Sequence, residues 1–223
     1  MSRYARLAYT PAVRQVQHEM GSGIAAGRRL REPGDLPEPL TSAEAAFVGS
    51  LDGFLLASVG ETGWPYVQFR GGPPGFVHVL DEGRIGYADV GGNRQYITTG
   101  NLRTDDRVAL FFIDHARRIR LKMFGHARAV PAADEPELAE RLVSTRTEGR
   151  VERLVVIEVE GYDWNCPRHI TPRFSERELT DVLAPVRERM AGLERENEEL
   201  RAQVAAMRQR EREEAAGPGR EHA

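Results

Sequence analysis

The run Gly91-Gly92-Asn93-Arg94-Gln95-Tyr96 stands between two strand-like segments, residues 84–89 and residues 107–113. The second segment, with the sequence RVALFFI, is the most strand-like run of the chain. We therefore expect a strand to end, two glycines to follow, and a polar helical segment to begin at once. Asn93 is a favoured helix N-cap, which predicts that Arg94 and Gln95 occupy the first helical turn.

Arg94 is unfavourable at such a position, because the helix dipole places partial positive charge at the N-terminal end, at a cost of about 0.3–1 kcal/mol. A bound anion would reverse the sign of this effect, since backbone N–H groups and Arg94 could then hold one phosphate group together. An ordinary loop with a solvated arginine explains the same residues equally well. The turn taken alone leaves both interpretations open.

Length, charge and cysteine content limit the classes of protein to consider. The 223 residues have room for one domain of about 150 residues with appendages. A net charge of -3 gives no electrostatic case for binding nucleic acid or an anionic membrane. The single cysteine, Cys166, excludes an internal disulfide and is typical of a reducing compartment. No apolar run approaches the roughly 20 residues that span a bilayer, and no signal-peptide segment is evident, so we expect a cytoplasmic protein.

Seven strand-like runs with few helices between them predict a mainly β (α+β) fold, an antiparallel barrel or sandwich rather than a βαβ fold. The runs cover residues 54–59, 64–70, 76–80, 84–88, 107–113, 119–130 and 153–160. Apolar and basic residues alternate in Ile119–Met123, as in a strand with two different faces. Short helices are expected to begin at Pro11, at Ser42 and at Pro136, the last reaching Thr145. Within the N-terminal segment 1–39, residues 21–39 are predicted to form an irregular linker.

The C-terminal segment is a separate element. After Ser175-Glu176-Arg177-Glu178, which has capping-box spacing, apolar residues recur with a 3-4 spacing. The d positions are Leu179, Val186, Leu193, Leu200 and Met207, and the a positions are Leu183, Met190, Asn197 and Val204. This pattern predicts a coiled-coil helix over residues 176–212, in which Pro185 must lie in the first turn or kink the helix. Residues 213–223 are expected to be disordered.

Asn197 and the charges beside the seam favour a parallel, two-stranded coil. A buried Asn at an a position is tolerated when it can pair with its twin in such a coil. Arg189 at g would face Glu194 at e of the partner helix, and Glu196 would face Arg201 in the same way. A lone surface helix, which is the alternative, would leave the seam exposed.

Several of these segments resemble, in the same order along the chain, the pyridoxamine 5'-phosphate oxidase-like proteins. Gly63–Arg70 is similar to the first flavin-contacting strand of that family, and the later strands and the turn follow in the family's order up to Met123–Arg128. Arg70–Phe76, Gly92–Tyr96 and Asp163–Pro172 are similar to an uncharacterised flavin-nucleotide-binding branch. The resemblance covers roughly residues 40–175. It implies a split β-barrel homodimer with FMN in two clefts at the subunit interface.

The resemblance also implies which residues hold the phosphate end of the cofactor. Asn93 and Arg94 match the family's phosphate-binding turn. Gln95 falls where the family often has Lys, so one positive charge is lost there. Gln68 and Arg70 lie on the strand that lines the isoalloxazine and phosphate side.

Further contacts are implied at the other end of the cofactor. Tyr87, Ala88 and Asp89 match a strand end whose backbone contacts the flavin. Arg120 falls where the oxidases usually have a Gln that reaches the flavin from the other subunit. Trp164 is expected to close the cleft.

The activity implied by the resemblance is that of an FMN-dependent oxidoreductase acting on an unidentified small molecule. The oxidases proper recognise pyridoxal phosphate through an Arg/Trp-rich C-terminal segment, and this chain has Asn165–Pro172 and the coil instead, so pyridoxamine phosphate oxidation is not assigned. Hydride transfer to the flavin would need no protein nucleophile, and no catalytic residue is predicted. Two alternatives stay open, namely the deazaflavin F420 in the same kind of barrel and a flavin-binding or assembly module without turnover.

Other candidate sites are weaker. Cys166 and His169 could form a thiolate or metal pair, but no second Cys or His lies near in sequence, so a structural role is favoured and no metal site is predicted. His78, His115 and His126 are each interpreted as surface or hydrogen-bonded histidines rather than bases. The basic run of residues 117–122 lacks interleaved aromatics, so the phosphate of a nucleotide cofactor is a better partner for it than nucleic acid.

Overall fold

The computed structural model describes residues 2–30, 36–143, 149–165 and 167–216, which divide into two units, Met1–Pro172 and Arg173–Ala223. The first unit contains six helices and seven strands within the described residues. The helices are α1 Arg3–Ala8, α2 Pro11–Glu19, α3 Gly23–Leu30, α4 Ser42–Ser50, α5 Ile97–Asn101 and α6 Pro136–Leu142. The strands are β1 Gly53–Val59, β2 Pro65–Gly71, β3 Val77–Asp81, β4 Arg84–Val90, β5 Arg107–Asp114, β6 Ile119–Pro131 and β7 Val151–Asn165.

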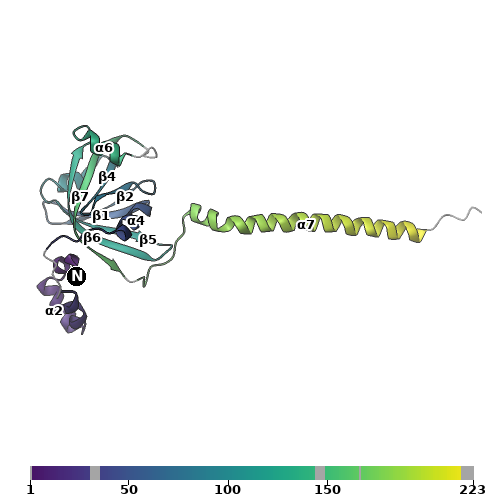
Figure 1. Ribbon diagram of the computed structural model, residues 1–223, viewed down its shortest axis with the longest axis horizontal. Coiled ribbons are helices and arrows are strands. Elements are labelled where there is room, and N and C mark those ends of the chain that lie inside the picture. Colours follow the sequence, from purple (N-terminus) through teal and green to yellow (C-terminus); the bar gives the residue numbers. More distant parts are fainter. Residues whose placement is uncertain (1, 31–35, 144–148, 166, 217–223) are drawn as a thin grey trace, which may run out of the picture. The chain divides into compact units, whose positions relative to one another are not determined.

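All seven strands belong to one antiparallel sheet with the order β2-β1-β5-β6-β7-β4-β3 (Figure 1). This confirms the predicted mainly β (α+β) class. β2 and β3 stand at the two ends of the order, and no strand pairing joins them among the described residues. The register shifts between Phe124 and Gly125, where a Cβ on Gly125 would overlap the carbonyl oxygen of Glu158. Glycine is required there for β6 and β7 to stay paired through the bulge.

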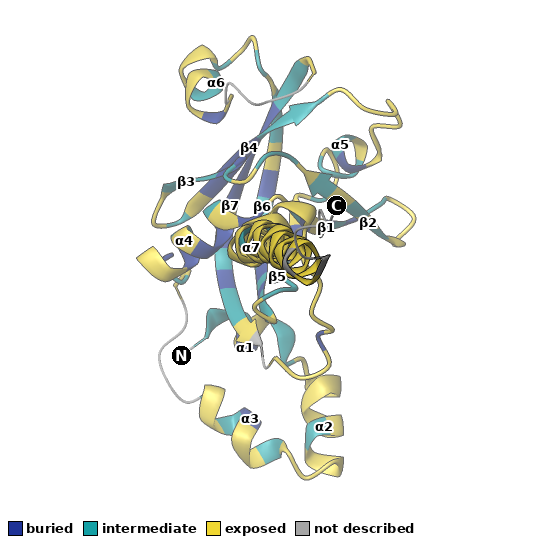
Figure 2. Cartoon of the chain, turned by 90° about the vertical axis from the view of Figure 1, so that its right-hand side faces the viewer, coloured by how far each residue is buried: buried dark blue, intermediate teal, exposed yellow. Residues whose placement is uncertain are grey.

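The core lies on one face of this sheet, because the central strands alternate buried and more exposed side chains (Figure 2). Phe54 on β1 is at its centre. Its ring lies 4.8 Å from that of Phe112 and 5.6 Å from that of Tyr87, measured between centroids. Both partners are at most 2% exposed. Each such aromatic contributes about 1.5–3 kcal/mol through burial, so this cluster holds β1, β4 and β5 together.

The N-terminal segment is more helical than predicted. The helix at Pro11 is confirmed, but α3 forms within the stretch expected to be irregular. α1 was not predicted either. Tyr4 of α1 stacks on Phe124 at 4.5 Å, and the backbone of α1 approaches so closely that a Cβ on Gly161 would meet the Tyr4 nitrogen at 2.5 Å. Tertiary packing of this kind, rather than local propensity, supports α1.

Helices α4 and α6 begin where the sequence predicts. α4 begins at Ser42 with a capping box, in which the Thr41 hydroxyl accepts from the Ala43 N–H and the Glu44 carboxylate accepts from the Thr41 N–H at 2.9 Å. α6 begins at Pro136 as expected and ends at Leu142, and residues 144–145 of the predicted helix lie outside the described residues.

The second unit consists of one helix, α7, Glu176–Ala216, with 41 residues. Its start is confirmed, since the Ser175 hydroxyl accepts from the Glu178 N–H at 3.2 Å and the Ser175 N–H donates to the Glu178 carboxylate at 2.8 Å. Pro185 lies inside α7 rather than in its first turn. Residues 213–216, expected in the tail, belong to the helix, and the rest of that tail lies outside the described residues. No described helix is both long and apolar enough to pass through a membrane.

Candidate functional site

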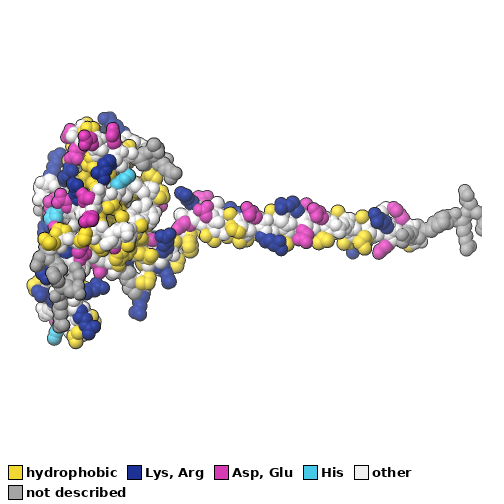
Figure 3. All heavy atoms as spheres, viewed as in Figure 1, with side chains coloured by type: hydrophobic (Ala, Val, Ile, Leu, Met, Phe, Trp, Pro, Cys, Tyr) yellow, Lys and Arg dark blue, Asp and Glu magenta, His cyan; other side chains and the backbone are white. Residues whose placement is uncertain are grey.

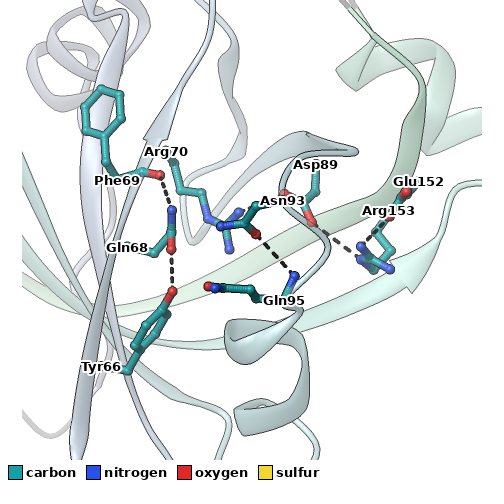
Figure 4. A network of polar contacts seen from close by, with 9 residues as sticks. All are labelled: Tyr66, Gln68, Phe69, Arg70, Asp89, Asn93, Gln95, Glu152 and Arg153. Carbon is teal, nitrogen blue, oxygen red and sulfur yellow. Dashed lines mark hydrogen bonds and ion pairs between the residues drawn. The ribbon is translucent and has the colours of Figure 1, made fainter.

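A pocket of about 190 Å³ lies where β2, the end of β4, the turn before α5 and the start of β7 meet (Figure 4). Its lining is mostly polar. The lining residues are Tyr66, Gln68, Arg70, Asp89, Val90, Gly92, Asn93, Arg94, Gln95, Tyr96, Ile97, Thr98, Thr99 and Arg153. They include three arginines and one carboxylate, so the pocket is suited to an anion.

Asp89 links two of the arginines. One oxygen of its carboxylate accepts from Arg70 Nη1 at 3.0 Å, and the other lies 3.4 Å from Arg153 Nε. Asp89 and Arg153 are directly opposite in the β4–β7 register, whereas Arg70 reaches Asp89 from β2. The three side chains are only 12–21% exposed. Both guanidinium groups are therefore held in place by one partly buried carboxylate, with less rotamer entropy left to lose on binding a ligand.

The turn between β4 and α5 differs from the prediction. The Asn93 side chain accepts from the Gln95 N–H at 3.2 Å and closes a local turn, so Asn93 is not a helix N-cap. α5 begins only at Ile97, and Arg94 and Gln95 are therefore outside its first turn. Arg94 and Tyr96 have φ angles of 60° and 52°, in the left-handed region that non-glycine residues seldom adopt. The dipole argument for a phosphate at this position is wrong, and the case for an anion rests on side chains instead.

Tyr96 connects this turn to β7. Its hydroxyl accepts from Arg94 Nε at 3.3 Å, a hydrogen bond that raises the pKa of the Arg94 guanidinium. The Arg153 guanidinium lies over the Tyr96 ring, 4.6 Å from its centroid, and also pairs with Glu152 at 2.7 Å. Tyr96 thus brings two cations to one wall of the pocket.

Two buried polar groups of the lining have no hydrogen-bond partner among the described residues. One is the hydroxyl of Thr98, a residue that is 5% exposed, and the other is Nε of Arg70. A buried donor or acceptor without a partner costs about 1–3 kcal/mol. Both residues belong to the lining of the pocket, so a ligand whose oxygen acceptors reached these two groups would remove that cost.

The pyridoxamine 5'-phosphate oxidase family model matches residues 40–165, which includes every residue that lines the pocket. The chain belongs to the pyridoxamine 5'-phosphate oxidase family. The predicted resemblance is therefore confirmed.

Several solved structures are similar to this chain. A putative pyridoxamine 5'-phosphate oxidase from Lactobacillus delbrueckii is 20% identical, with 56% of this chain and 93% of that chain covered and a TM-score of 0.43. An FMN-binding protein from Syntrophomonas wolfei is 12% identical, with coverages of 70% and 97% and a TM-score of 0.41. An F420 reductase is 16% identical, with coverages of 56% and 98% and a TM-score of 0.40. No curated protein matches the chain.

Six of the residues predicted from the sequence meet in this pocket of the oxidase-family barrel. They are Gln68, Arg70, Asp89, Asn93, Arg94 and Gln95. Tyr87 lies in the core, where burial raises the pKa of its phenol, and Ala88 is not part of the lining. The sequence did not assign Tyr66, Thr98 or Arg153 to the site. Tyr66 lies within the Gly63–Arg70 segment of the resemblance, whereas no local pattern marks Thr98 or Arg153.

Arg120 and Trp164 lie outside the pocket. Trp164 donates from Nε1 to Glu44 at 2.6 Å and packs edge-on against Phe47, so it closes a contact between β7 and α4. Arg120 is on β6, opposite Asn165 of β7. A role for Arg120 toward the cleft of a second subunit stays a prediction.

A larger cavity of about 550 Å³ lies between α1 and strands β1, β5 and β6, but it offers fewer polar groups that could bind a ligand. Its lining is largely apolar. Two polar groups of its lining already have partners, since Arg3 pairs with Glu160 at 2.9 Å and the His126 ring lies 2.8 Å from Asp106. Among the described residues, no group of His, Cys, Asp or Glu is arranged to hold a metal ion, and Cys166 lies outside them.

Proposed function

We propose that this protein binds FMN, with the phosphate in the pocket beside Asp89, and acts as an FMN-dependent oxidoreductase on a small molecule. The observation that carries the proposal is the convergence of Arg70, Arg94 and Arg153 on a pocket whose buried Thr98 hydroxyl has no partner among the described residues. Membership of the pyridoxamine 5'-phosphate oxidase family supports the same cofactor.

The donor set suits a phosphate monoester. Arg70, Arg94 and the Thr98 hydroxyl would donate to its oxygens, and the Asn93 amide is placed on the same turn. Hydrogen bonds between such cations and phosphate are about twice as strong as neutral ones. Asp89 would keep its two arginines in position and would leave the lining with more positive than negative charge.

The pocket is too small for the whole cofactor. Its volume of about 190 Å³ lies below the roughly 300–1,000 Å³ of sites that enclose a drug-sized ligand. The phosphate and ribityl end would fill it, and the ring system would extend along β2 past Gln68 and Tyr66. A second protomer would then cover the ring.

An apolar face near β2 supports a homodimer. Leu55, Val67 and Phe69 are 39%, 56% and 61% exposed on β1 and β2, and Leu55 stands directly opposite Phe69 in the register. Trp64, at the start of β2, is 77% exposed. Exposed apolar side chains gathered in this way mark an interaction surface. Val67 and Phe69 point to the face of β2 opposite to Gln68 and Arg70. We propose that two barrels associate through this apolar face.

The chemistry would come from the cofactor. FMN, when bound, supplies a flavin ring that accepts a hydride from a donor. The described lining residues include no Cys, His or Lys, and the Tyr66 hydroxyl already donates to the side-chain amide oxygen Oε1 of Gln68. The side chains of this chain would therefore bind and orient the cofactor and exclude water. A second candidate function is that of a flavin carrier without turnover. F420 presents a phosphoryl group too and is the alternative cofactor.

The deciding experiment purifies the chain and measures its visible spectrum and the mass of the molecule that co-purifies. We expect flavin absorption bands and the mass of FMN, whereas the mass of F420 would support the alternative cofactor. Anaerobic NAD(P)H should bleach the flavin if the protein is a reductase and should leave it oxidised if the protein is a carrier.

Substitutions locate the cofactor. Asn93→Ala and Arg94→Ala should each lower flavin content. Arg84→Ala should not, because Arg84 pairs with Asp81 at the far end of β4. Full flavin content in both turn variants would show that the phosphate lies elsewhere.

A further inference from the structure

α7 carries a seam of exposed apolar side chains along its length. The eight apolar residues at the a and d positions have exposures from 39% at Leu183 to 61% at Met207. They are Leu179, Leu183, Val186, Met190, Leu193, Leu200, Val204 and Met207. Hydrophobic side chains recur along the helix between charged ones (Figure 3). A soluble helix with a seam of this length needs a partner.

The spacing of the seam specifies another helix as that partner. Apolar residues repeat every 3.5 positions on average, which keeps them on one line only if two helices supercoil around each other. α7 is continuous from Glu176 to Ala216. Pro185 is at a c position, on the side away from the seam, so it does not break the contact surface.

Asn197 and the flanking charges identify the partner as a second copy of α7 that runs in the same direction. In a parallel, in-register coil the two Asn197 amides face each other and can hydrogen-bond, whereas in an antiparallel coil each would face an apolar d residue. The pairs from g to e of the partner are Arg189 with Glu194 and Glu196 with Arg201, and both are attractive. The apolar seam, the Asn197 pair and the flanking charges therefore all favour two parallel copies of α7.

We propose that the α7 helices of two chains form a parallel, in-register, two-stranded coiled coil. At 1.5 Å per residue, α7 is about 60 Å long. Parallel pairing brings the two Ser175 ends together, whereas antiparallel pairing would separate them by about that length. Only Arg173 and Phe174 lie between the end of the first unit at Pro172 and the Ser175 cap. The coil thus tethers two barrels at an effective concentration on the order of millimolar.

Disulfide trapping in the full chain tests this directly. In a Cys166→Ser background, Val204→Cys places a thiol at an a position near one end of the seam. Ala205→Cys places the control thiol at the neighbouring b position, which faces away. Under mild oxidation the a-position variant should give on the order of tenfold more disulfide-linked dimer than the control, because only facing a residues come within disulfide reach.

Each other outcome overturns the proposal. An antiparallel coil puts the two residues 204 at opposite ends and gives no linkage. A dimer held by the barrels alone links positions 204 and 205 equally poorly, and a helix that binds a different protein leaves the purified chain unlinked. A second variant, Leu193→Asp added to Val204→Cys, should abolish the linkage without changing barrel stability in urea. Linkage that survives Leu193→Asp would contradict a seam-mediated coil.

Discussion

Thr98→Val separates a binding role of this hydroxyl from a structural one, because the two roles predict changes of opposite sign. Thr98 is 5% exposed, and its hydroxyl has no partner among the described residues. Valine keeps the shape and removes the unpaired polar group. The free energy of unfolding of the FMN-free variant should therefore exceed that of the FMN-free parent by up to about 1–3 kcal/mol, which is the cost of an unsatisfied buried group.

FMN binding should change in the other direction. A hydrogen bond to a charged phosphate contributes about 1.5–3 kcal/mol, so losing it should raise the Kd for FMN about 10- to 150-fold. Urea unfolding of the FMN-free protein measures the first effect, and titration of FMN fluorescence measures the second. The expected result is a more stable protein that binds its cofactor less tightly.

Ser58→Ala is the matched control. Ser58 is also buried, at 2% exposure, but its hydroxyl accepts from Asn101 Nδ2 at 2.9 Å. Its loss should destabilise the fold by about 0.5–1.5 kcal/mol and leave the Kd for FMN unchanged. Thr98→Val would refute our reasoning if it destabilised the FMN-free protein, or if it altered the Kd by less than twofold.

Three further changes test the site and the fold. Arg70→Met should raise the Kd for FMN about 10- to 150-fold through the loss of one charge-assisted hydrogen bond, and fluorescence titration should show no change for the surface variant Arg84→Met. Glu44→Ala should lower the free energy of unfolding in urea by about 1–3 kcal/mol, since it leaves Trp164 Nε1 without its acceptor and removes the α4 capping box; an unchanged urea midpoint would contradict this. Burial, together with nearby Arg141, lowers the pKa of His78, so its contribution to stability is present above about pH 6.5 and is lost as the pH falls toward its folded-state pKa. Urea midpoints between pH 7 and pH 5 should fall less steeply in His78→Gln.

The strands could be predicted because their signal is local. The run of residues 107–113 corresponds to β5, Arg107–Asp114. It could be predicted because buried and more exposed side chains alternate from one residue to the next. β7 continues to Asn165, five residues beyond its predicted end. Gly161, the first residue beyond the predicted end, is the place where the backbone of α1 approaches β7. That reason is tertiary, and a reading of the local sequence cannot detect it.

The site was partly predictable for the same reason. Asn93, Arg94 and Gln95 are neighbours in sequence and were identified together. Arg153 was missed, because it meets Asp89 only through the β4–β7 pairing, across 64 positions. The helix start was placed too early, since an Asn that caps a helix and an Asn that closes its own turn give the same sequence signal. Only the Asn93–Gln95 hydrogen bond distinguishes the two.

The small size of the pocket connects the proposed FMN binding with the proposed coiled coil of α7. A pocket of about 190 Å³, defined by arginines held on Asp89, can recognise the anionic end of a cofactor, but it leaves the reactive end to surfaces outside it. If a second barrel supplies those surfaces, cofactor binding depends on the association of two barrels. A parallel coil of α7 would tether the two barrels, so that their association becomes intramolecular. The cleft would then stay assembled at protein concentrations where the barrel faces alone would separate. The substrate would then be selected by the shared cleft, and the phosphate pocket would serve as a common anchor whatever the substrate is.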